Sequence, residues 1–251
     1  YLDENDISLS ELQEIYIDVR DKAYKIIELK RATYYGIGLA LKRIVSCILN
    51  NERAILPVSA YQNGEYGKEG YFMNIVIITG SPRKKGNSFA MTEAFIKAAE
   101  KRGHTITRFD VAMMNVGGCR ACETCFKTGK ACSFNDDFNI IAPAIQDADA
   151  IVFSMPVYWY SIPSQIKAVI DKLFSFYNAK VDIADKECAL ISCCEENDES
   201  VFDGVRVPIE RSAALLNWKM VGTVLVPAVV NVGDIDKTNG CKQAEDLANK
   251  F

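Results

Sequence analysis

The stretch Met73–Ser88 reads MNIVIITGSPRKKGNS, and it decides the fold. A continuous apolar run, residues 75–78, stops at a polar loop that contains Gly80, and an apolar pattern with helical spacing begins at Phe89. This order is typical of a buried strand, a short loop and the start of a helix. The backbone N–H groups of such a loop, with the positive end of the helix dipole, favour the binding of a phosphate group.

Four polar side chains in or beside this loop are candidate phosphate ligands: Ser81, Arg83, Asn87 and Ser88. The loop lacks the lysine of the G-x-x-x-x-G-K-[ST] motif and the glycine spacing of G-x-G-x-x-G. A single terminal phosphate monoester therefore suits it better than a pyrophosphate. The alternative is an ordinary strand-to-helix turn in which a Ser or Asn side chain caps the helix.

Composition restricts the class of protein. The chain has 251 residues, of which 49% are hydrophobic and 25% charged, as expected for one large or two small globular domains. The net charge of −4 argues against nucleic acid as the main partner. The longest apolar runs are about half of what spans a bilayer, and no signal-peptide pattern is present, so we expect a cytoplasmic protein without a membrane partner. In that setting, nine cysteines indicate free, catalytic or metal-binding thiols rather than a disulfide framework.

The character of the sequence changes at Phe72–Met73, which predicts two parts, residues 1–72 and 73–251. In the first part, residues 7–30 and 34–50 carry apolar side chains at helical spacing. A predicted strand at 54–61 and a turn at 63–67 follow. This N-terminal segment is expected to be mainly helical, with no second strand to complete a sheet.

The N-terminal segment resembles the C-terminal part of L-lactate dehydrogenase. The matching words are KAYKIIELK (Lys22–Lys30), ATYYGIG (Ala32–Gly38) and NNERAILPVSAY (Asn50–Tyr61). The dinucleotide fingerprint of that family is missing, as is the segment with its catalytic histidine, and the only histidine here, His104, lies outside the match. We therefore expect a fused, non-catalytic segment without dehydrogenase activity, since the acid/base group is absent.

From Met73 onward, predicted strands and helices alternate. This alternation predicts a five-stranded parallel sheet with helices on both faces, which binds ligands at the carboxyl ends of its strands. Strands are predicted at Asn74–Ile78, Thr105–Asp110, Ala150–Ser154, Glu187–Cys193 and Met220–Val226, and helices at Ser88–Arg102, Pro163–Phe174, Ser200–Leu216 and Thr238–Lys250.

Three further loops are predicted at the same edge of the sheet, and the last of them, Pro227–Asp234, has Asn231 and Gly233 as turn residues. Met155–Pro163 holds three consecutive aromatic residues, Tyr158, Trp159 and Tyr160. These suit a flat conjugated ligand, which gains from stacking and desolvation; alternatively they pack on a neighbouring subunit, and both can hold together. The loop Ser192–Asn197 is small and polar and then acidic, so it can place backbone donors beside the edge of a ring.

Four cysteines lie between the second and third strands with the spacing C-x2-C-x2-C-x6-C: Cys119, Cys122, Cys125 and Cys132. Three interpretations stay open, namely a [4Fe–4S] cluster, a zinc ion, and free thiols. Zinc ligands come more often as two C-x2-C pairs. Of the other cysteines, Cys188 is predicted to be a core residue on a strand.

Residues 73–251 resemble the flavodoxin-like NAD(P)H-dependent FMN reductases, and especially their iron–sulfur flavoprotein branch. The motifs that carry the resemblance are GSPRKKGNS (Gly80–Ser88), GCRACETC (Gly118–Cys125), PVYW (Pro156–Trp159) and KAVID (Lys167–Asp171). The resemblance implies an α/β flavodoxin-like fold with strand order 2-1-3-4-5, bound FMN, NAD(P)H as co-substrate, and a homodimer or homotetramer. It also implies roles for individual residues. The FMN phosphate would be held by Ser81, Arg83, Asn87 and Ser88. The ribityl chain and isoalloxazine ring would be lined by Pro156, Val157, Tyr158 and Trp159, and Ser192 would face the ring from its other side. The possible ligands of a [4Fe–4S] cluster are Cys119, Cys122, Cys125 and Cys132.

These observations favour an FMN-dependent oxidoreductase. It would pass electrons from NADH or NADPH to a quinone, a nitroaromatic, free flavin or a protein acceptor, with an iron–sulfur cluster as a possible relay. No side chain is assigned as an acid or base, because the redox chemistry belongs to the flavin. The alternative is an electron carrier of the flavodoxin kind, without substrate turnover.

Overall fold

The computed structural model describes residues 42–43, 45–46, 49, 62–63, 69–70 and 72–251. The chain divides into two compact units, residues 1–60 and 61–251. Of the predicted helix at 34–50, the described residues are helical, whereas the predicted helix at 7–30 and strand at 54–61 lie outside the described residues. The boundary at Phe72–Met73 stays a prediction. None of the helices in the described ranges is long and apolar enough to cross a membrane.

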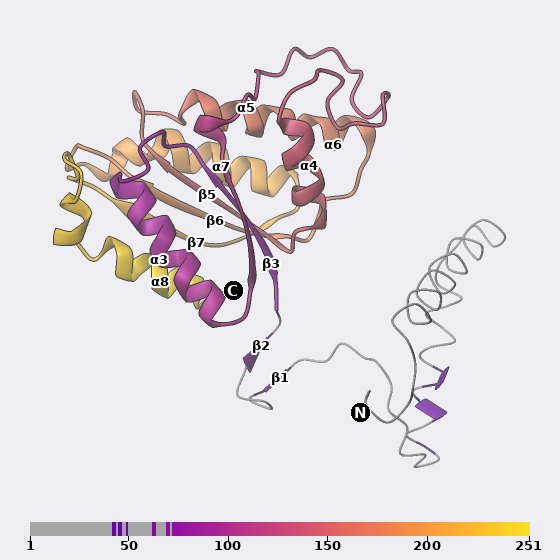
Figure 1. Cartoon of the computed structure of the whole chain (residues 1–251), viewed down its shortest axis with the longest axis horizontal. Coiled ribbons are helices and arrows are strands. Elements are labelled where there is room, and N and C mark those ends of the chain that lie inside the picture. The colour runs from indigo at the N-terminus through magenta and orange to yellow at the C-terminus, as the bar shows by residue number, and fades with distance from the viewer. Residues whose placement is uncertain (1–41, 44, 47–48, 50–61, 64–68, 71) are drawn as a thin grey trace, which may run out of the picture. The chain divides into compact units, whose positions relative to one another are not determined.

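The second unit contains the predicted parallel sheet, in the order β4-β3-β5-β6-β7 (Figure 1). Numbered within the sheet, this order is 2-1-3-4-5, so the predicted flavodoxin-like topology is confirmed. A short antiparallel pair, β1 (Gln62–Asn63) and β2 (Glu69–Gly70), precedes it and flanks the predicted turn. The five strands are β3 (Asn74–Thr79), β4 (Thr105–Asp110), β5 (Ala150–Pro156), β6 (Glu187–Cys193) and β7 (Lys219–Val226).

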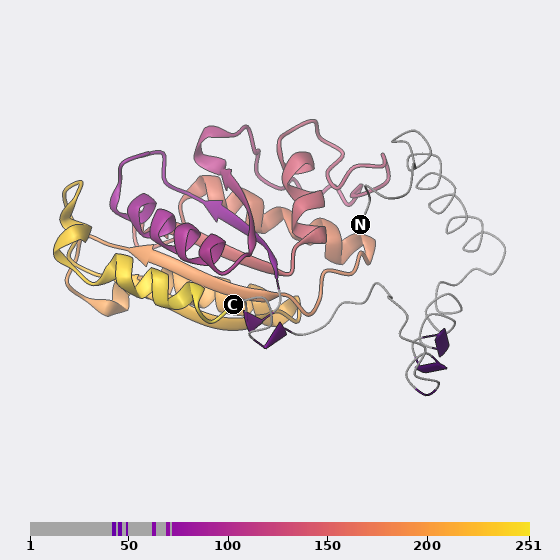
Figure 2. The ribbon, with the colours of Figure 1, turned by 60° about the horizontal axis from the view of Figure 1, so that its bottom comes forward.

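Helices cover both faces of this sheet (Figures 1 and 2). One face is covered by α3 (Asn87–Lys101) and α8 (Gly240–Ala248), which pack against each other. The other is covered by α4 (Phe138–Asp147), α5 (Ser164–Lys172) and α7 (Asp203–Leu215), and the short α6 (Phe174–Ala179) follows α5. Single 3-10 turns lie at η2 (Val111–Met113), η3 (Glu199–Phe202) and η4 (Asp234–Lys237).

The strands divide their side chains between two separate cores. On β3, Ile75 and Ile77 lie in the core beneath α3, whereas Val76 and Ile78 lie in the core beneath α4. Successive side chains of a strand point to opposite faces, so a strand that is buried on both faces must be apolar at every position. Cys188, on β6, is fully buried in the second of these cores, as predicted.

The structure departs from the predicted elements in three places. Helix α4 was not predicted, because Pro143 interrupts an otherwise apolar helical pattern. The helix predicted at Pro163–Phe174 is divided into α5 and α6 at Leu173. Strand β5 runs on to Pro156, which is paired in register with Cys193 of β6.

The aromatic loop after β5 is a tight turn that rests on α7. Tyr158 and Ser161 exchange two backbone hydrogen bonds of 3.0 Å, and the residues between them, Trp159 and Tyr160, have φ of 47° and 59°. Few non-glycine residues adopt this left-handed conformation. Gly204, in the first turn of α7, lies so close that a Cβ atom there would be 1.7 Å from the carbonyl oxygen of Tyr160. The aromatic turn therefore requires glycine at position 204.

We expect Gly204→Ala to lower the free energy of unfolding by about 1–3 kcal/mol, the range for a side chain forced into a packed site. In a helix, alanine is intrinsically more favourable than glycine by about 1 kcal/mol. Helix propensity alone would therefore make the variant more stable, so a loss of stability reports the close contact with Tyr160. Urea unfolding of the full chain measures it. The control is Gly118→Ala, where a Cβ would meet nothing within 4 Å. A Gly204→Ala protein as stable as the parent would contradict the close contact.

Candidate functional site

A cavity of 210 Å³ lies at the carboxyl ends of the central strands, where the sequence predicts ligand binding. Most of the predicted FMN-binding residues line it together, although they come from two loops far apart in the sequence. Its lining comprises Ser81, Arg83, Gly86, Asn87, Ser88, Pro156, Val157, Tyr158, Cys193, Cys194, Glu195, Val229, Val230 and Val232.

Two predicted residues do not line this cavity. Trp159 is at the tip of the aromatic turn and is 94% exposed. Ser192 is fully buried, and within the described part of the chain its hydroxyl has no hydrogen-bond partner. Cys193 and the residues that follow it line the cavity instead. The loop that follows β7 also lines the cavity, through Val229, Val230 and Val232, none of which was predicted as a site residue.

The helix that faces the cavity begins without a side-chain cap. Gly86 is the N-cap residue of α3, with extended backbone (φ −77°, ψ 169°), and no side chain accepts from the first turn. The alternative of a Ser or Asn N-cap is therefore not what the structure shows. The Gly86 N–H donates to the carbonyl oxygen of Arg83 (3.0 Å), and the Arg83 N–H donates to Ser81 Oγ (3.2 Å). This turn leaves the helix N-terminus, with its positive dipole end, beside an arginine on the cavity wall.

The side-chain amide of Asn87 holds the loop after β7 against the start of α3. Its Nδ2 donates to the carbonyl oxygen of Asn231 (3.0 Å), and its Oδ1 accepts from the N–H groups of Gly233 (3.1 Å) and Ile235 (3.3 Å). Asn87 Oδ1 and one N–H of Nδ2 are thereby engaged, so Asn87 shapes the cavity that it also lines. Its predicted role as a phosphate ligand stays a prediction.

A buried thiol lies behind the phosphate end of the cavity. Burial raises the pKa of Cys193 to about 12, with a smaller contribution from Cys194 in the same direction, and a hydrogen bond with the Ser88 backbone opposes them. Cys193 is therefore a neutral thiol at pH 7, and it places no negative charge next to a bound phosphate.

The four-cysteine loop forms a second, separate cavity of 20 Å³. Cys119, Cys122, Cys125 and Cys132 all line it, and all four are free thiols. However, the described residues include no group of three or more His, Cys, Asp or Glu side chains placed to hold a metal ion. The predicted metal ligands are thus brought to one cavity, but this arrangement fits neither a [4Fe–4S] cluster nor a zinc ion.

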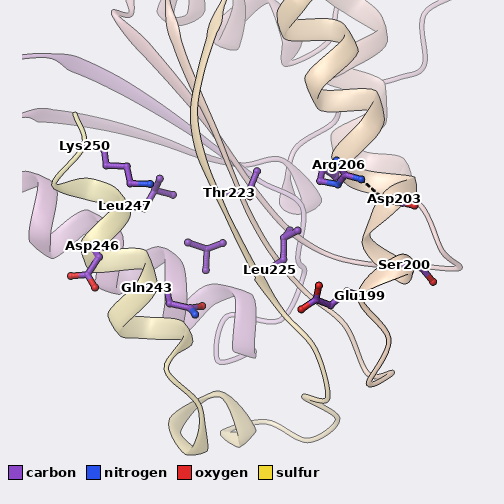
Figure 3. A pocket seen from close by; sticks show the side chains of 11 residues that line it. Glu199, Ser200, Asp203, Arg206, Thr223, Leu225, Gln243, Asp246, Leu247 and Lys250 are labelled. Atoms are coloured by element: carbon purple, nitrogen blue, oxygen red, sulfur yellow. Dashed lines mark hydrogen bonds and ion pairs between the residues drawn. The ribbon is translucent and has the colours of Figure 1, made fainter.

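A third cavity, of 670 Å³, follows the free edge of β7 between α7 and α8 (Figure 3). None of the predicted site residues lines it. Its charged groups have mixed signs, and its arginine, Arg206, already pairs with Asp203 (2.6 Å) on the same helix. This open groove is larger than the cavity at the strand ends, and its cations are the paired Arg206, on α7, and Lys250, which follows α8.

Two protein families match the chain. The NADPH-dependent FMN reductase family matches residues 73–200, and the α/β C-terminal domain of lactate/malate dehydrogenases matches residues 2–102. The two matches overlap from residue 73 to 102, which includes strand β3 of the five-stranded sheet and helix α3, which packs on that sheet.

Several curated relatives are L-lactate dehydrogenases that match about a third of the chain or less. L-lactate dehydrogenase 2 of Lactococcus lactis subsp. lactis is 55% identical over 69 residues, which are 28% of this chain and 22% of that protein. L-lactate dehydrogenase 2 of Enterococcus faecalis is 51% identical over 85 residues, 33% of this chain and 25% of that protein. The chain thus spans about a quarter or less of the length of these relatives.

Solved structures share the fold of the second unit. The NAD(P)H:quinone oxidoreductase of Methanothermobacter marburgensis has a TM-score of 0.54 at 19% identity, covering 71% of this chain and 95% of that one. An FMN-dependent NADH-azoreductase of Bacillus anthracis, solved in complex with FMN, has a TM-score of 0.53 at 15% identity, covering 70% and 98%.

The family match covers half of the chain, from β3 to the start of η3, and it includes the uncapped helix start, the aromatic turn and the four-cysteine loop. The chain therefore belongs to the NADPH-dependent FMN reductase family and carries a lactate dehydrogenase-like segment at its N-terminus.

Proposed function

We propose that this protein is an FMN-dependent oxidoreductase that uses NAD(P)H to reduce a quinone, a nitroaromatic compound, free flavin or a protein acceptor. One observation carries the proposal: a single cavity is lined both by an uncapped helix N-terminus with Arg83 and by Tyr158 of the aromatic turn. FMN has a matching arrangement, with a phosphate at one end and a flat ring at the other. The family match and the FMN bound in the azoreductase of the same fold support this assignment.

The phosphate end is suited to a dianion. Arg83 supplies a full positive charge, and the first turn of α3 supplies backbone N–H donors and the helix dipole. The neutral Cys193 thiol behind them adds no repulsion. Ser81 and Ser88, which also line the cavity, are the hydroxyls available to the remaining phosphate oxygens.

The ring end is open and aromatic. Tyr158 lines the cavity, and Trp159 and Tyr160 project from a turn whose geometry is fixed by its backbone hydrogen bonds and by Gly204. Bound FMN supplies the two-electron chemistry, and these side chains orient planar molecules beside it and exclude water. We assign acid or base chemistry to no side chain. The exposed aromatic rim also suits the contact surface of a homodimer or homotetramer, which stays a prediction.

No step is assigned to an iron–sulfur cluster, because the four thiols are not placed to hold metal among the residues described. The cluster predicted from the resemblance is tested by the absorbance spectrum of protein purified without oxygen, since cluster and flavin bands differ.

Binding and turnover test the proposed function directly. The full chain mixed with FMN should show a perturbed flavin spectrum, and anaerobic NADH or NADPH should bleach it. Adding a quinone should restore the oxidised spectrum and give sustained turnover. Slow bleaching with stable one-electron states would instead identify an electron carrier, and a protein that does not bind FMN would exclude both functions.

We expect Arg83→Ala to weaken FMN binding by about 10–100-fold, which corresponds to the loss of a charged hydrogen bond worth about 1.5–3 kcal/mol. Titration of flavin fluorescence measures the affinity. Riboflavin, which lacks the phosphate, should bind the variant and the parent equally. The matched control is Lys84→Ala, which removes the next cation in the sequence, a side chain outside the cavity lining. Equal losses for FMN and riboflavin would contradict a phosphate role.

Acid should loosen the wall of the cavity formed by the loop after β7. Asp234 accepts from the N–H of Asn231 (2.7 Å) and from Lys237 Nζ (2.8 Å). Its hydrogen bond with Lys237, followed by that with Asn231, lowers the pKa of Asp234 from 3.8 to about 2. A lowered pKa in the folded state means that the carboxylate stabilises the fold above its unfolded pKa, and that this contribution is lost as the pH falls through the folded pKa.

The parent should have a higher free energy of unfolding than the Asp234→Asn variant, and this difference should therefore shrink as the pH falls from 3.8 to about 2. Urea unfolding at several pH values measures this difference. An advantage that stays constant over this range would show that ionisation of Asp234 does not hold the loop.

A further inference from the structure

Two of the side chains that line the candidate flavin cavity are charged at neutral pH, and they have opposite signs. Arg83 is the cation, and Glu195, in the loop after β6, is the only carboxylate among the described residues of this lining. The thiols on the same wall, Cys193 and Cys194, stay neutral, because burial raises the pKa of both. The negative charge of the cavity wall therefore resides on one side chain.

The carboxylate of Glu195 is not neutralised by a neighbour. Glu195 is exposed, and within the described part of the chain its side chain takes part in no ion pair and no hydrogen bond. Charges at a protein surface act over about 8–10 Å at ordinary ionic strength. The carboxylate therefore acts on a molecule in the cavity even where the two do not touch.

Hydrogen bonds fix the backbone on both sides of Glu195. The N–H of Val229 donates to the carbonyl oxygen of Cys194 (3.0 Å), and the N–H of Ala228 donates to that of Glu196 (3.0 Å). The Cys194 thiol donates to the same Glu196 oxygen (3.2 Å). Glu195 is thus held at a defined place on the wall.

The loop that contains Glu195 is also joined to the aromatic turn. Cys193 is in register with Pro156 at the end of the β5–β6 pairing, and its carbonyl oxygen accepts from the N–H of Val157 (2.9 Å). Glu195 and Tyr158 each follow this last pair by two residues, and both line the cavity. Glu195 therefore belongs to the part of the wall where the proposed function places the flavin ring and the molecules that react with it.

We propose that Glu195 is a specificity-determining residue that selects against acceptors with a negative charge, so that the protein reduces planar acceptors that are neutral or cationic. This inference rests on the proposed function. Arg83 would offset the charge of the FMN phosphate, whereas the described lining offers no second cation to offset Glu195. An anionic acceptor beside the ring is therefore repelled, and a neutral quinone or nitroaromatic compound is not. The dihydronicotinamide ring of NAD(P)H is itself uncharged, so the same carboxylate does not oppose the donor.

Equilibrium binding tests the charge effect without turnover. Naphthalenesulfonamide and naphthalenesulfonate share one planar body and differ by one negative charge. Each is titrated into the full chain loaded with FMN, and the change in the flavin absorbance spectrum gives its dissociation constant. The sulfonate should bind the parent more weakly than the sulfonamide, and Glu195→Gln should reduce this difference by about 3–10-fold at low salt, the size of a partly screened charge–charge interaction. High salt should reduce the difference in the parent in the same way.

The matched control is Glu196→Gln, which removes the next carboxylate in the sequence, a side chain outside the cavity lining. It should change the ratio of the two dissociation constants by less than about twofold, because its charge is farther from the ligand and more strongly screened. A ratio that Glu195→Gln leaves unchanged, or that both variants lower equally, would overturn the proposal.

Steady-state turnover separates this inference from the function on which it rests. With naphthoquinone and its sulfonate as acceptors, Glu195→Gln should lower the preference for the neutral quinone, measured as the ratio of the two kcat/KM values, by about 3–10-fold. The parent and the variant are compared on the same two quinones, so the difference between the reduction potentials of the quinones cancels. A parent that binds FMN and reduces both quinones, with a preference that Glu195→Gln does not alter, would overturn the inference alone. A parent that does not bind FMN would overturn the proposed function and the inference with it.

Discussion

The central strand β3 is hydrogen-bonded to a parallel neighbour on each side, and this double pairing determines where the functional groups lie. Thr79 is in register with Asp110 of β4 and with Ser154 of β5, so β3 and β4 end at one level and β5 runs on two residues beyond it, to Pro156. Side-chain bonds strengthen the same alignment: Thr79 Oγ1 donates to Asp110 Oδ1 (2.6 Å), and the Ser154 hydroxyl is 2.7 Å from Thr92 of α3. The loops after these strands therefore meet at one edge, and the start of α3 lies among them.

A second constraint brings in a loop that the central pairing does not reach. The amide of Asn87 binds the backbone of residues more than 140 positions away along the chain, from Asn231 to Ile235. Together with the hydrogen bond from the Val229 N–H to the carbonyl oxygen of Cys194 (3.0 Å), this connection places the valines after β7 beside the phosphate loop. The Asn87 side chain thus links the start of α3 to the segment after β7. Its hydrogen bonds there explain why a polar residue is buried at the start of this helix.

The sequence was sufficient for the features that depend on local pattern and insufficient for those that depend on distant partners. Apolar runs and alternation predicted all five strands, because burial on two faces leaves a clear signal, whereas α4 was missed because Pro143 argues against a helix. The sequence indicated Asn87 as a residue of the phosphate loop but could not predict its hydrogen bonds to the loop after β7, since those partners lie far away along the chain. On β6, predicting which residue faces the ligand required the register with β5, and that register places Cys193 opposite Pro156.

For the four-cysteine loop, too, the sequence pattern alone does not determine the chemistry. A C-x2-C-x2-C-x6-C spacing is compatible with cluster, zinc and thiol chemistry, because each requires only that sulfur atoms come near one another. The structure adds that the four thiols line one small cavity and that, among the described residues, no three of them are placed to hold an ion. The anchor of this loop, Asp136 with Lys172, is a buried ion pair, which contributes little net stability because desolvation opposes its attraction. Its effect is to fix position, since a loop tied to α5 keeps its thiols against one wall while the flavin cavity is shaped independently by Asn87.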